Sequence, residues 1–221
     1  MITVKSVLKN IYLVVKRIFD IIIAAILLIL LFIPFIIIGI AIKIEDKGPV
    51  FYTQDRVGRN LKFFKIYKFR SMKTNRKELS SNMSHDEMVT KVGKFLRKTS
   101  IDELPQLINI IKGEMSFIGP RPWIPEYYEF FTDEQKKRSD VLPGISGLAQ
   151  AKGRNKINIF KKIDYDIEYV NNISLWMDIK CIWLTIITLF KKDEAEISES
   201  GIKGEIEQLQ EQRNKVEKSE N

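Results

Sequence analysis

The sequence predicts an α+β fold in which a small, mostly helical domain with a short β-hairpin follows one N-terminal re-entrant membrane helix. Three observations support this prediction: an uncharged apolar run near the N-terminus, two extended segments joined around a glycine, and several apolar-periodic segments bounded by Gly and Pro. We therefore divide the chain into a membrane segment at 1–45, a folded domain at 46–190 and an acidic, polar tail at 191–221.

Length and composition narrow the class of protein. A chain of 221 residues has room for one domain of ordinary size and an appendage. Its single Cys excludes an internal disulfide and a Cys-rich zinc site. The mean hydropathy of −0.11 excludes a polytopic membrane protein, so the apolar residues must be concentrated in one region.

That region is the run from Ile21 to Ile42, which holds 22 residues without a charge. A straight helix of this length is roughly 33 Å long and could just cross a bilayer. Pro34 interrupts the run, however, and basic residues flank both ends, so the positive-inside rule gives no direction. A helix–break–helix that enters and leaves by one face satisfies both observations; the alternative is a kinked single-pass anchor. The flanking residues are Lys5, Lys9, Lys16 and Arg17 before the run, then Lys43, Lys47, Arg56 and Arg59 after it.

Charge is distributed unevenly along the rest of the chain. The tail from Lys191 carries six basic and nine acidic residues, which leaves residues 1–190 with a net charge of +11. A basic body beside a membrane segment suits an anionic leaflet and phosphate-bearing ligands, with nucleic acid as the other common partner for such charge. The tail is rich in Glu, Lys and Gln, so we expect it to be disordered or loosely helical.

The folded domain is expected to begin with the hairpin, whose two segments at 50–58 and 61–72 meet around Gly58. Basic and aromatic residues alternate in its second segment, an arrangement that could stack bases but beside a membrane anchor favours the headgroup level. Residues 73–88 are polar, which indicates a mobile loop. We expect His85, which lies in it, to be a surface residue. Helices are expected at 101–112, 127–141, 158–171 and 176–190, the last too short in its uncharged part to span a membrane.

The first candidate site is the pair Asp102-Glu103. Local pattern allows two interpretations. Ser100 and Glu103 could form a capping box at a helix start. Alternatively, Pro105 could occupy the first helical position, which would leave both carboxylates outside the helix and able to meet a cation or a phosphate. In that case Asp102 could attack phosphorus and Glu103 could hold Mg²⁺.

Two further segments could bind phosphate. In Pro120-Arg121-Pro122 the prolines restrict the backbone on both sides of an arginine, a residue suited to bidentate phosphate contact, although a rigid connector would look the same. Glycines at 143–147 and the segment around Gly153 and Arg154 could bring backbone N–H groups to a phosphate, although an ordinary turn is the better interpretation. A single His excludes a Ser-His-Asp triad, so acid–base chemistry must fall to carboxylates or to a substrate phosphate.

Taken together, these segments resemble the bacterial sugar transferases, and in particular their small monotopic form, the phosphoglycosyl transferases that load a phosphosugar onto polyprenol phosphate. The resemblance is specific, because the segments follow the family's order over about residues 16–190. They are Lys16-Arg17-Ile18-Phe19-Asp20, Gly48-Pro49-Val50-Phe51, Gln54 with Arg56 and Gly58, Lys68-Phe69-Arg70-Ser71-Met72, residues 99–106, residues 113–122, residues 143–147 and Gly153-Arg154-Asn155.

The resemblance implies an enzyme of the bacterial inner membrane, with residues 46–190 as its cytoplasmic catalytic domain, a re-entrant helix and amphipathic helices at the interface. Asp102 would attack the β-phosphorus of a UDP-sugar and release UMP, and polyprenol (undecaprenyl) phosphate would then take the phosphosugar. Asp102 and Glu103 would hold Mg²⁺. The residues implied to contact substrate are Arg97, Pro120, Arg121, Pro122, Gly153, Arg154 and, as a support, Asp166; those implied to set the membrane anchor are Lys16, Arg17, Asp20 and Pro34.

The resemblance also carries departures. The family often has Ser before the membrane proline, where this chain has Ile33. The tail lies outside the resemblance and could bind a partner, and we expect the chain to be the catalytic core without the extra membrane helices of larger relatives. We expect no nucleic-acid partner, and a homo-oligomer or downstream glycosyltransferases as possible protein partners. The rival hypotheses are a non-catalytic, membrane-anchored basic binding protein and an inactive scaffold on the same fold.

Overall fold

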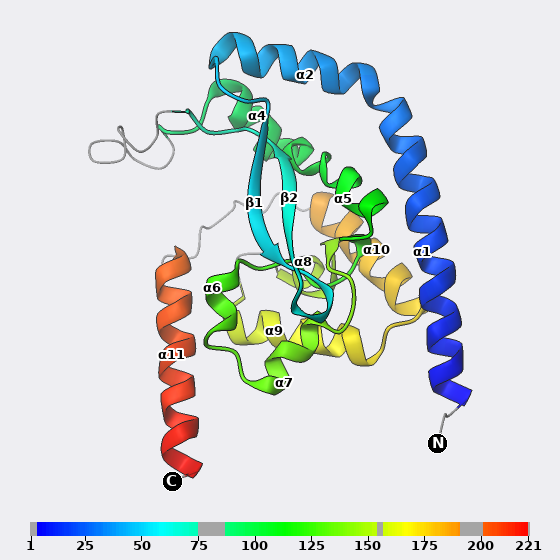
Figure 1. Ribbon diagram of the computed structural model, residues 1–221, viewed down its shortest axis with the longest axis vertical. Helices are drawn as coiled ribbons and strands as arrows, with labels where there is room; N and C mark the ends of the chain where they lie inside the picture. The colour runs from blue at the N-terminus through cyan, green and yellow to red at the C-terminus, as the bar shows by residue number, and fades with distance from the viewer. Residues whose placement is uncertain (1–3, 75–86, 154–156, 191–200, 221) are drawn as a thin grey trace. The chain divides into compact units, whose positions relative to one another are not determined.

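The computed structural model describes residues 4–74, 87–153, 157–190 and 201–220 (Figure 1). The predicted α+β class is confirmed, with helices, two pairs of strands and three 3₁₀ turns in the described residues. The helices are α1 (Val4–Leu30), α2 (Phe32–Glu45), α4 (Lys91–Thr99), α5 (Gln106–Lys112), α6 (Pro125–Tyr128), α7 (Asp133–Lys136), α8 (Leu148–Gly153), α9 (Ile159–Asn171), α10 (Leu175–Phe190) and α11 (Gly201–Glu220). The strands are β1 (Phe51–Val57), β2 (Phe63–Phe69), β3 (Ser116–Ile118) and β4 (Gly144–Ser146), and the 3₁₀ turns are η1 (Arg59–Leu61), η2 (Ile101–Glu103) and η3 (Lys137–Ser139).

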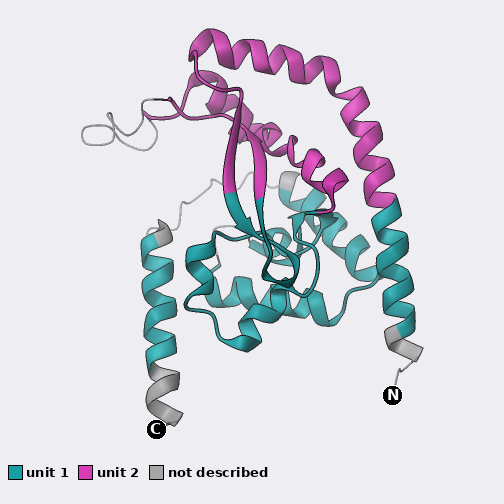
Figure 2. Ribbon diagram, viewed as in Figure 1, with its two compact units in different colours: residues 1–18, 55–64, 114–221 teal, residues 19–54, 65–113 magenta. Residues whose placement is uncertain are grey.

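The chain divides into two compact units, each made of segments that are separated in the sequence (Figure 2). Unit 1 contains Met1–Ile18, Asp55–Phe64 and Glu114–Asn221, and unit 2 contains Phe19–Gln54 and Lys65–Gly113. Helix α1 and the β1–β2 hairpin each contribute residues to both units.

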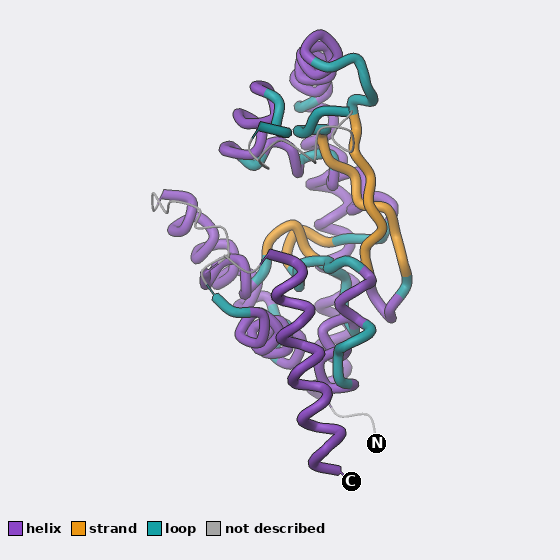
Figure 3. The backbone as a smooth tube through the Cα atoms, turned by 90° about the vertical axis from the view of Figure 1, so that its left-hand side faces the viewer, coloured by secondary structure: helices purple, strands orange, loops and turns teal. Residues whose placement is uncertain are grey.

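The predicted hairpin is confirmed: β1 and β2 pair as antiparallel strands of seven residues each (Figure 3). Their connection is tighter than a plain loop, because η1 closes it with Asn60 and Leu61 at φ values of 55° and 59°. The Lys62 amide donates to the Arg59 carbonyl, and the Gly58 amide donates to the Lys62 carbonyl.

A second pair of strands, β3 and β4, was not predicted. They run parallel, with Ser116 opposite Gly144 and Ile118 opposite Ser146. Three residues are too few to show alternation in a sequence. The pairing requires glycine where the two backbones meet, because a Cβ on Gly144 would lie 2.2 Å from the Gly119 nitrogen.

The N-terminal apolar run is helical on both sides of a bend. No single described helix is long and apolar enough to cross a membrane, but α1 and α2 pass that test together as a pair bent by 61°. The break lies at Leu31 and not at Pro34, so the expected division at the proline is wrong. The proline ring lacks an N–H and clashes with the carbonyl four residues earlier, so it disturbs the helical turn that precedes it. In the first turn of α2, where Pro34 lies, a proline is tolerated because the N–H groups there have no intrahelical partner.

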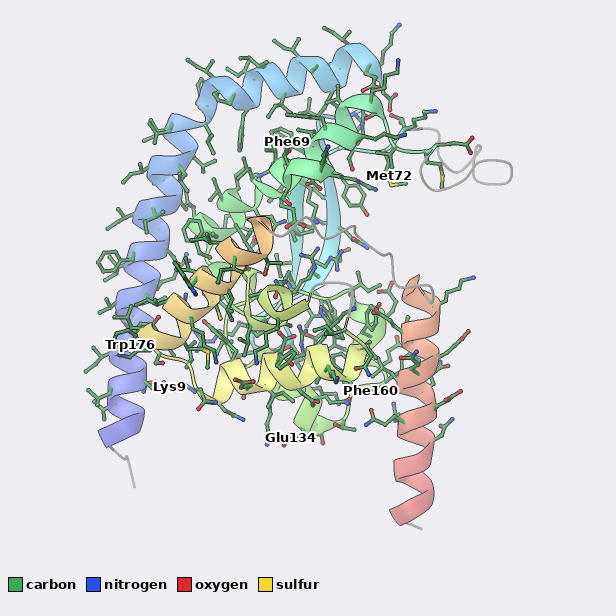
Figure 4. All side chains as sticks on the ribbon, turned by 180° about the vertical axis from the view of Figure 1, so that it is seen from behind. Lys9, Phe69, Met72, Glu134, Phe160 and Trp176 are labelled. Atoms are coloured by element: carbon green, nitrogen blue, oxygen red, sulfur yellow. The ribbon has the colours of Figure 1, made fainter. Side chains whose placement is uncertain are left out.

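Unit 2 has a small core in which α2 packs against α4 and against the end of the hairpin where β1 begins and β2 ends. Ile42, Phe69 and Leu96 are buried there, with Val50 packed beside them (Figure 4 labels Phe69). The Arg70 guanidinium donates to the backbone carbonyl of Asp46 and joins β2 to the end of α2.

Two core clusters among the described residues of unit 1 both include side chains of α9. One cluster contains Ile118, Leu148 and Cys181 together with Tyr169 of α9. The other contains aromatic residues of the segment 123–131 together with α9 residues Ile159 and Ile163. The predicted helices at 158–171 and 176–190 correspond to α9 and α10 and are confirmed.

The expected helix at 127–141 is wrong as a single element. The chain forms α6, then restarts at α7 and continues as η3. Thr132 causes the restart, because it accepts from the Gln135 amide while the Gln135 side chain accepts from the Thr132 amide. This capping box was overlooked in the sequence.

Residues of the predicted tail form α11 in the described part of the chain. Leu209 of this helix is buried in the second cluster of unit 1. Glu205 accepts a hydrogen bond from the Tyr127 hydroxyl and pairs with Lys162, both at 2.6 Å. Residues 75–86, which include His85 and most of the predicted loop, lie outside the described residues.

The N-terminal part of α1 belongs to unit 1 and is held there by Asp178. This buried carboxylate pairs with Lys16 at 2.5 Å and accepts hydrogen bonds from the Tyr12 and Tyr169 hydroxyls at 2.7 Å each. Arg17 donates to the Met115 carbonyl at 3.3 Å. Lys16 and Arg17, predicted as residues of the membrane anchor, thus hold α1 to the folded domain.

Replacing Asp178 with Ala should therefore destabilise the protein strongly. The change leaves the largely buried Lys16 ammonium unpaired, and the expected loss is about 3–5 kcal/mol. Thermal unfolding in detergent would measure it. Asp133→Ala, at a fully exposed carboxylate, is the control and should leave the midpoint unchanged; equal midpoints for the two variants would contradict the assignment.

Candidate active site

Asp102 and Glu103 lie on a short turn between two helices of unit 2. Helix α4 ends at Thr99, and Ser100 closes it in the left-handed conformation with φ 57°. The turn η2 then carries both acids, and Pro105 directly precedes α5. The capping-box interpretation is wrong, because Ser100 makes no side-chain cap and ends the preceding helix. The carboxylates lie outside α5, as the second interpretation expected, although the proline stands one position before the first helical residue.

Glu103 is paired with Lys68 of β2. The ammonium nitrogen lies 2.6 Å from the Glu103 Oε1 atom, and both side chains are about four-fifths buried. The sequence placed Lys68 among residues at the headgroup level; the structure gives it a carboxylate partner. A positive charge therefore lies next to the acidic pair.

The surroundings of Asp102 raise the pKa of its carboxyl above the ordinary value. Burial is the largest cause, because it removes water from the charged form. The positive charge of Lys68 opposes this, the negative charge of Glu103 adds to it, and Arg97 lowers the pKa to a smaller extent. Burial thus leaves the charged form of this carboxyl less stabilised than it would be in water.

Two polar side chains, of Arg97 and Asn109, hold the elements around this turn with three hydrogen bonds. Arg97, on the last turn of α4, donates from Nε to the Ser71 hydroxyl at 2.8 Å. Asn109 of α5 is fully buried and acts as a strand neighbour: its amide group donates to the Lys65 carbonyl at 2.8 Å, and its oxygen accepts from the Tyr67 amide at 3.0 Å. Asn109 thereby joins α5 to the part of β2 that carries Lys68.

The acidic pair is also the place where unit 2 could hold a metal ion. Within the described ranges no group of three or more His, Cys, Asp or Glu side chains could hold one. Mg²⁺, however, is commonly bound by one or two carboxylates together with substrate phosphates, and carboxylate oxygens are the hard donors that it prefers. Asp102 and Glu103 fit that kind of site.

The predicted Pro120-Arg121-Pro122 segment lies in unit 1, where four consecutive carbonyl oxygens each accept a hydrogen bond. The Gly144 amide donates to Pro120 at 2.9 Å, and the Val57 amide donates to Trp123 at 3.0 Å. Two arginines supply the middle pair: Arg138 donates to the Arg121 carbonyl at 2.6 Å and Arg56 to the Pro122 carbonyl at 3.2 Å. We call residues 120–123 the clamped segment.

Arg138 also accounts for the position of Asp166. The fully buried Asp166 carboxylate accepts from Arg138 Nε at 3.1 Å and from Nη2 at 2.6 Å. Burial raises the pKa of Asp166, and the Arg138 guanidinium opposes that shift. Arg138 lies over the Trp123 ring at 4.4 Å, and its Nη1 donates to the Tyr128 hydroxyl at 2.6 Å.

A small cavity adjoins the clamped segment. It encloses about 160 Å³, part of which is open to solvent. It is lined by both apolar and polar residues: Val57, Gly58, Pro120, Arg121, Tyr128, Arg138, Ser139, Val141 and Pro143. Pro120 and Arg121 are thus at a concave surface of unit 1.

The predicted site residues therefore fall into two groups. Asp102, Glu103 and Arg97 come together in unit 2, while Pro120, Arg121, Pro122 and Asp166 come together in unit 1 through Arg138. Gly153 lies in unit 1 at the end of α8, and Arg154 lies outside the described residues. The sequence indicated no role for Arg138. It placed Lys68 at the headgroup level and not beside the acidic pair, although Lys68 belongs to a segment that carried the family resemblance.

Comparison with known proteins identifies the family. The bacterial sugar transferase family matches residues 11–192. The uncharacterized sugar transferase EpsL of Bacillus subtilis is 41% identical over 174 residues, which cover 78% of this chain and 86% of EpsL. The chain belongs to the bacterial sugar transferase family.

Larger relatives are similar over part of their length. The galactosyl transferase CpsE of Streptococcus agalactiae is 42% identical over 80% of this chain. The UDP-glucose:undecaprenyl-phosphate glucose-1-phosphate transferase of Escherichia coli is 40% identical over 79% of it. This chain covers only 42% and 40% of those two proteins.

The raised pKa of Asp102 leads to a prediction about stability. A carboxyl whose pKa is higher in the folded than in the unfolded state makes the protein less stable as the pH rises through that pKa. Asp102→Asn, which keeps the shape and removes the charge, should therefore raise the unfolding midpoint at pH 7. The difference from the native protein should shrink as the pH falls and Asp102 becomes protonated. A midpoint lowered at pH 7 would contradict this account.

Proposed function

We propose that this protein transfers a sugar phosphate from a UDP-sugar to undecaprenyl phosphate through an aspartyl phosphosugar on Asp102. The observation that carries the proposal is the half-buried Asp102 carboxylate, raised in pKa and presented on a turn outside both neighbouring helices. Membership of the bacterial sugar transferase family supports the reaction class, as do relatives named for transfer to undecaprenyl phosphate.

In the first half-reaction an Asp102 oxygen attacks the β-phosphorus of the UDP-sugar. The bond between that phosphorus and the bridging oxygen breaks, and UMP leaves with the electron pair. In the second half-reaction an oxygen of undecaprenyl phosphate attacks the same phosphorus, which regenerates the Asp102 carboxylate and gives undecaprenyl diphosphosugar. A covalent intermediate allows two dissimilar substrates to use one small site in turn.

Positive charge is what both half-reactions require, because phosphate oxygens repel an attacking carboxylate. Mg²⁺ held by Asp102 and Glu103 would supply charge that neutralises those oxygens. Lys68 and Arg97, both on unit 2, contribute positive charge of their own close to the acidic pair. Arg121, and Arg154 by the family resemblance, are proposed to bind the diphosphate.

The proposed lipid substrate requires a membrane surface, and two regions carry suitable side chains. On α2 the apolar residues Ile33, Ile37 and Ile44 are mostly exposed. On α10 the exposed fraction is 79% for Trp176 (Figure 4) and 63% for Trp183. We propose that the bent pair α1–α2 is re-entrant in the inner membrane and that α10 lies at its cytoplasmic interface, where tryptophan is favoured.

The central test is UMP release from a panel of UDP-sugars, with and without undecaprenyl phosphate and Mg²⁺. Asp102→Asn should reduce the rate by roughly 10³-fold or more, because it removes the nucleophile. Without undecaprenyl phosphate, the native protein should gain the mass of one sugar phosphate, and Asp102→Asn should not. Asp133→Asn, at an exposed carboxylate, is the matched control. Unchanged release in Asp102→Asn would overturn the assignment, and no release from any UDP-sugar would favour the binding or scaffold hypotheses.

The interfacial position of α10 can be tested with the three tryptophans of the chain. Variants that keep only Trp176 or only Trp183, with Phe at the other two positions, should lose fluorescence in vesicles of brominated phosphatidylcholine, because bromine on the acyl chains quenches nearby indoles. The variant that keeps only Trp123, which is buried in unit 1, is the control and should keep its emission. Equal quenching of all three would contradict an interfacial α10.

A further inference from the structure

We propose that Arg138 is a positioning residue for Arg121, with its guanidinium fixing the clamped segment so that the Arg121 side chain is presented in one orientation. The inference deepens the proposed function, because it rests on Arg121 as a ligand of the donor diphosphate. Arg138 has no role in the resemblance on which the site was predicted.

The backbone of the clamped segment shows why one residue can matter. Its outer carbonyls, of Pro120 and Trp123, accept from backbone amides of β4 and β1. The carbonyl of Arg121 instead accepts from a side chain, that of Arg138, 17 residues further along the chain. The peptide unit that follows the Arg121 Cα is therefore oriented by a group that mutation can remove without altering either strand.

Arg138 is itself fixed on all sides. Nε and Nη2 donate to Asp166, Nη2 also donates to the Arg121 carbonyl, Nη1 donates to the Tyr128 hydroxyl, and the guanidinium lies over the Trp123 ring. With four of the five N–H groups of a guanidinium engaged in this way, Arg138 has little capacity left for a phosphate of its own. Its geometry suits a residue that acts through Arg121.

Stability alone does not account for an ion pair at this place. Two apolar side chains of similar volume often stabilise a protein as well as a buried ion pair does, or better. They could not, however, donate to the Arg121 carbonyl. The hydrogen bond from Arg138 to the Arg121 carbonyl is therefore lost when apolar side chains replace the Arg138–Asp166 pair, even if they pack equally well. This difference allows an experiment to distinguish a positioning role from a purely structural one.

The test uses the full-length protein in detergent and the double variant Arg138→Met/Asp166→Leu, which replaces the pair by apolar groups. Its unfolding midpoint should stay near that of the native protein, whereas kcat/KM for the UDP-sugar should fall roughly 100-fold, the cost expected for a misplacement of about 1 Å. Arg213→Met is the matched control, since Arg213 also donates to a backbone carbonyl, that of Glu129, and it should keep native kcat/KM.

A double-mutant cycle then asks whether the loss is transmitted through Arg121. In the Arg121→Ala background the same pair of changes should reduce kcat/KM by less than about threefold. Additive losses, or a stable pair variant with native kcat/KM, would overturn the inference. Arg138→Lys is the second variant if the apolar pair does not fold: it keeps a charge beside Asp166 but lacks the planar fork, and it should also lose kcat/KM.

Hydrogen exchange provides a measurement that does not depend on activity. The amides of Gly144 and Val57 report on the clamped segment, because they donate to its outer carbonyls. Both should exchange faster in the pair variant, or in Arg138→Lys if that is the variant that folds, than in Arg213→Met. If the native protein releases no UMP, or if Arg121→Ala has native kcat/KM, the proposed function of the protein or of Arg121 fails. Exchange then decides the inference alone, and unchanged exchange would overturn it.

Discussion

The arrangement of unit 1 depends on the ion pair and the two hydrogen bonds of the buried Asp178 carboxylate. It joins three helices, because Lys16 and Tyr12 lie on α1, Tyr169 lies on α9, and Asp178 itself lies on α10. A charge removed from water costs several kcal/mol unless it is paired and hydrogen-bonded, and here all its partners come from the protein. The apolar N-terminal helix is therefore attached to the folded domain by a specific polar contact.

The carboxylates of the two proposed substrate-binding regions differ in how far they are exposed. Asp166 is fully buried and held by two hydrogen bonds from one guanidinium, so its position is fixed. Asp102 is only half-buried, and burial raises its pKa despite Lys68 and Arg97. Burial raises the pKa of both carboxyls, but Asp102 keeps part of its surface exposed, as a group that must meet a substrate requires. The contrast favours Asp102 as the reacting group and Asp166 as part of the support.

Elements with strong local signals could be predicted from the sequence. The apolar run, the alternating hairpin and the periodic helices α9 and α10 are of this kind. The bend was also indicated, but it lies at Leu31, since a proline disturbs the turn before it. The strands β3 and β4 have three residues each, and only their pairing across the chain defines them. The helix start at Thr132 is also encoded locally, by the capping-box residues Thr132 and Gln135, although it was not predicted.

The candidate site was predictable only in part, and for a physical reason. The position of Asp102 and Glu103 outside a helix was one of two interpretations, and the family resemblance supplied their roles. Arg138 follows Lys136 and Lys137, so the sequence gives it the appearance of a surface charge. Its burial depends on Asp166 and Trp123, which are distant in the chain, and no local pattern encodes such a contact.

The separation between Lys16 and Asp178 also has a consequence for the order of events during synthesis. The two residues are 162 positions apart. At a translation rate of about 5–20 residues per second, Lys16 emerges roughly 8–32 seconds before its partner. Unit 2 ends at Gly113 and can be complete in that interval. The apolar helix is therefore synthesised well before the contact that attaches it to unit 1 can form.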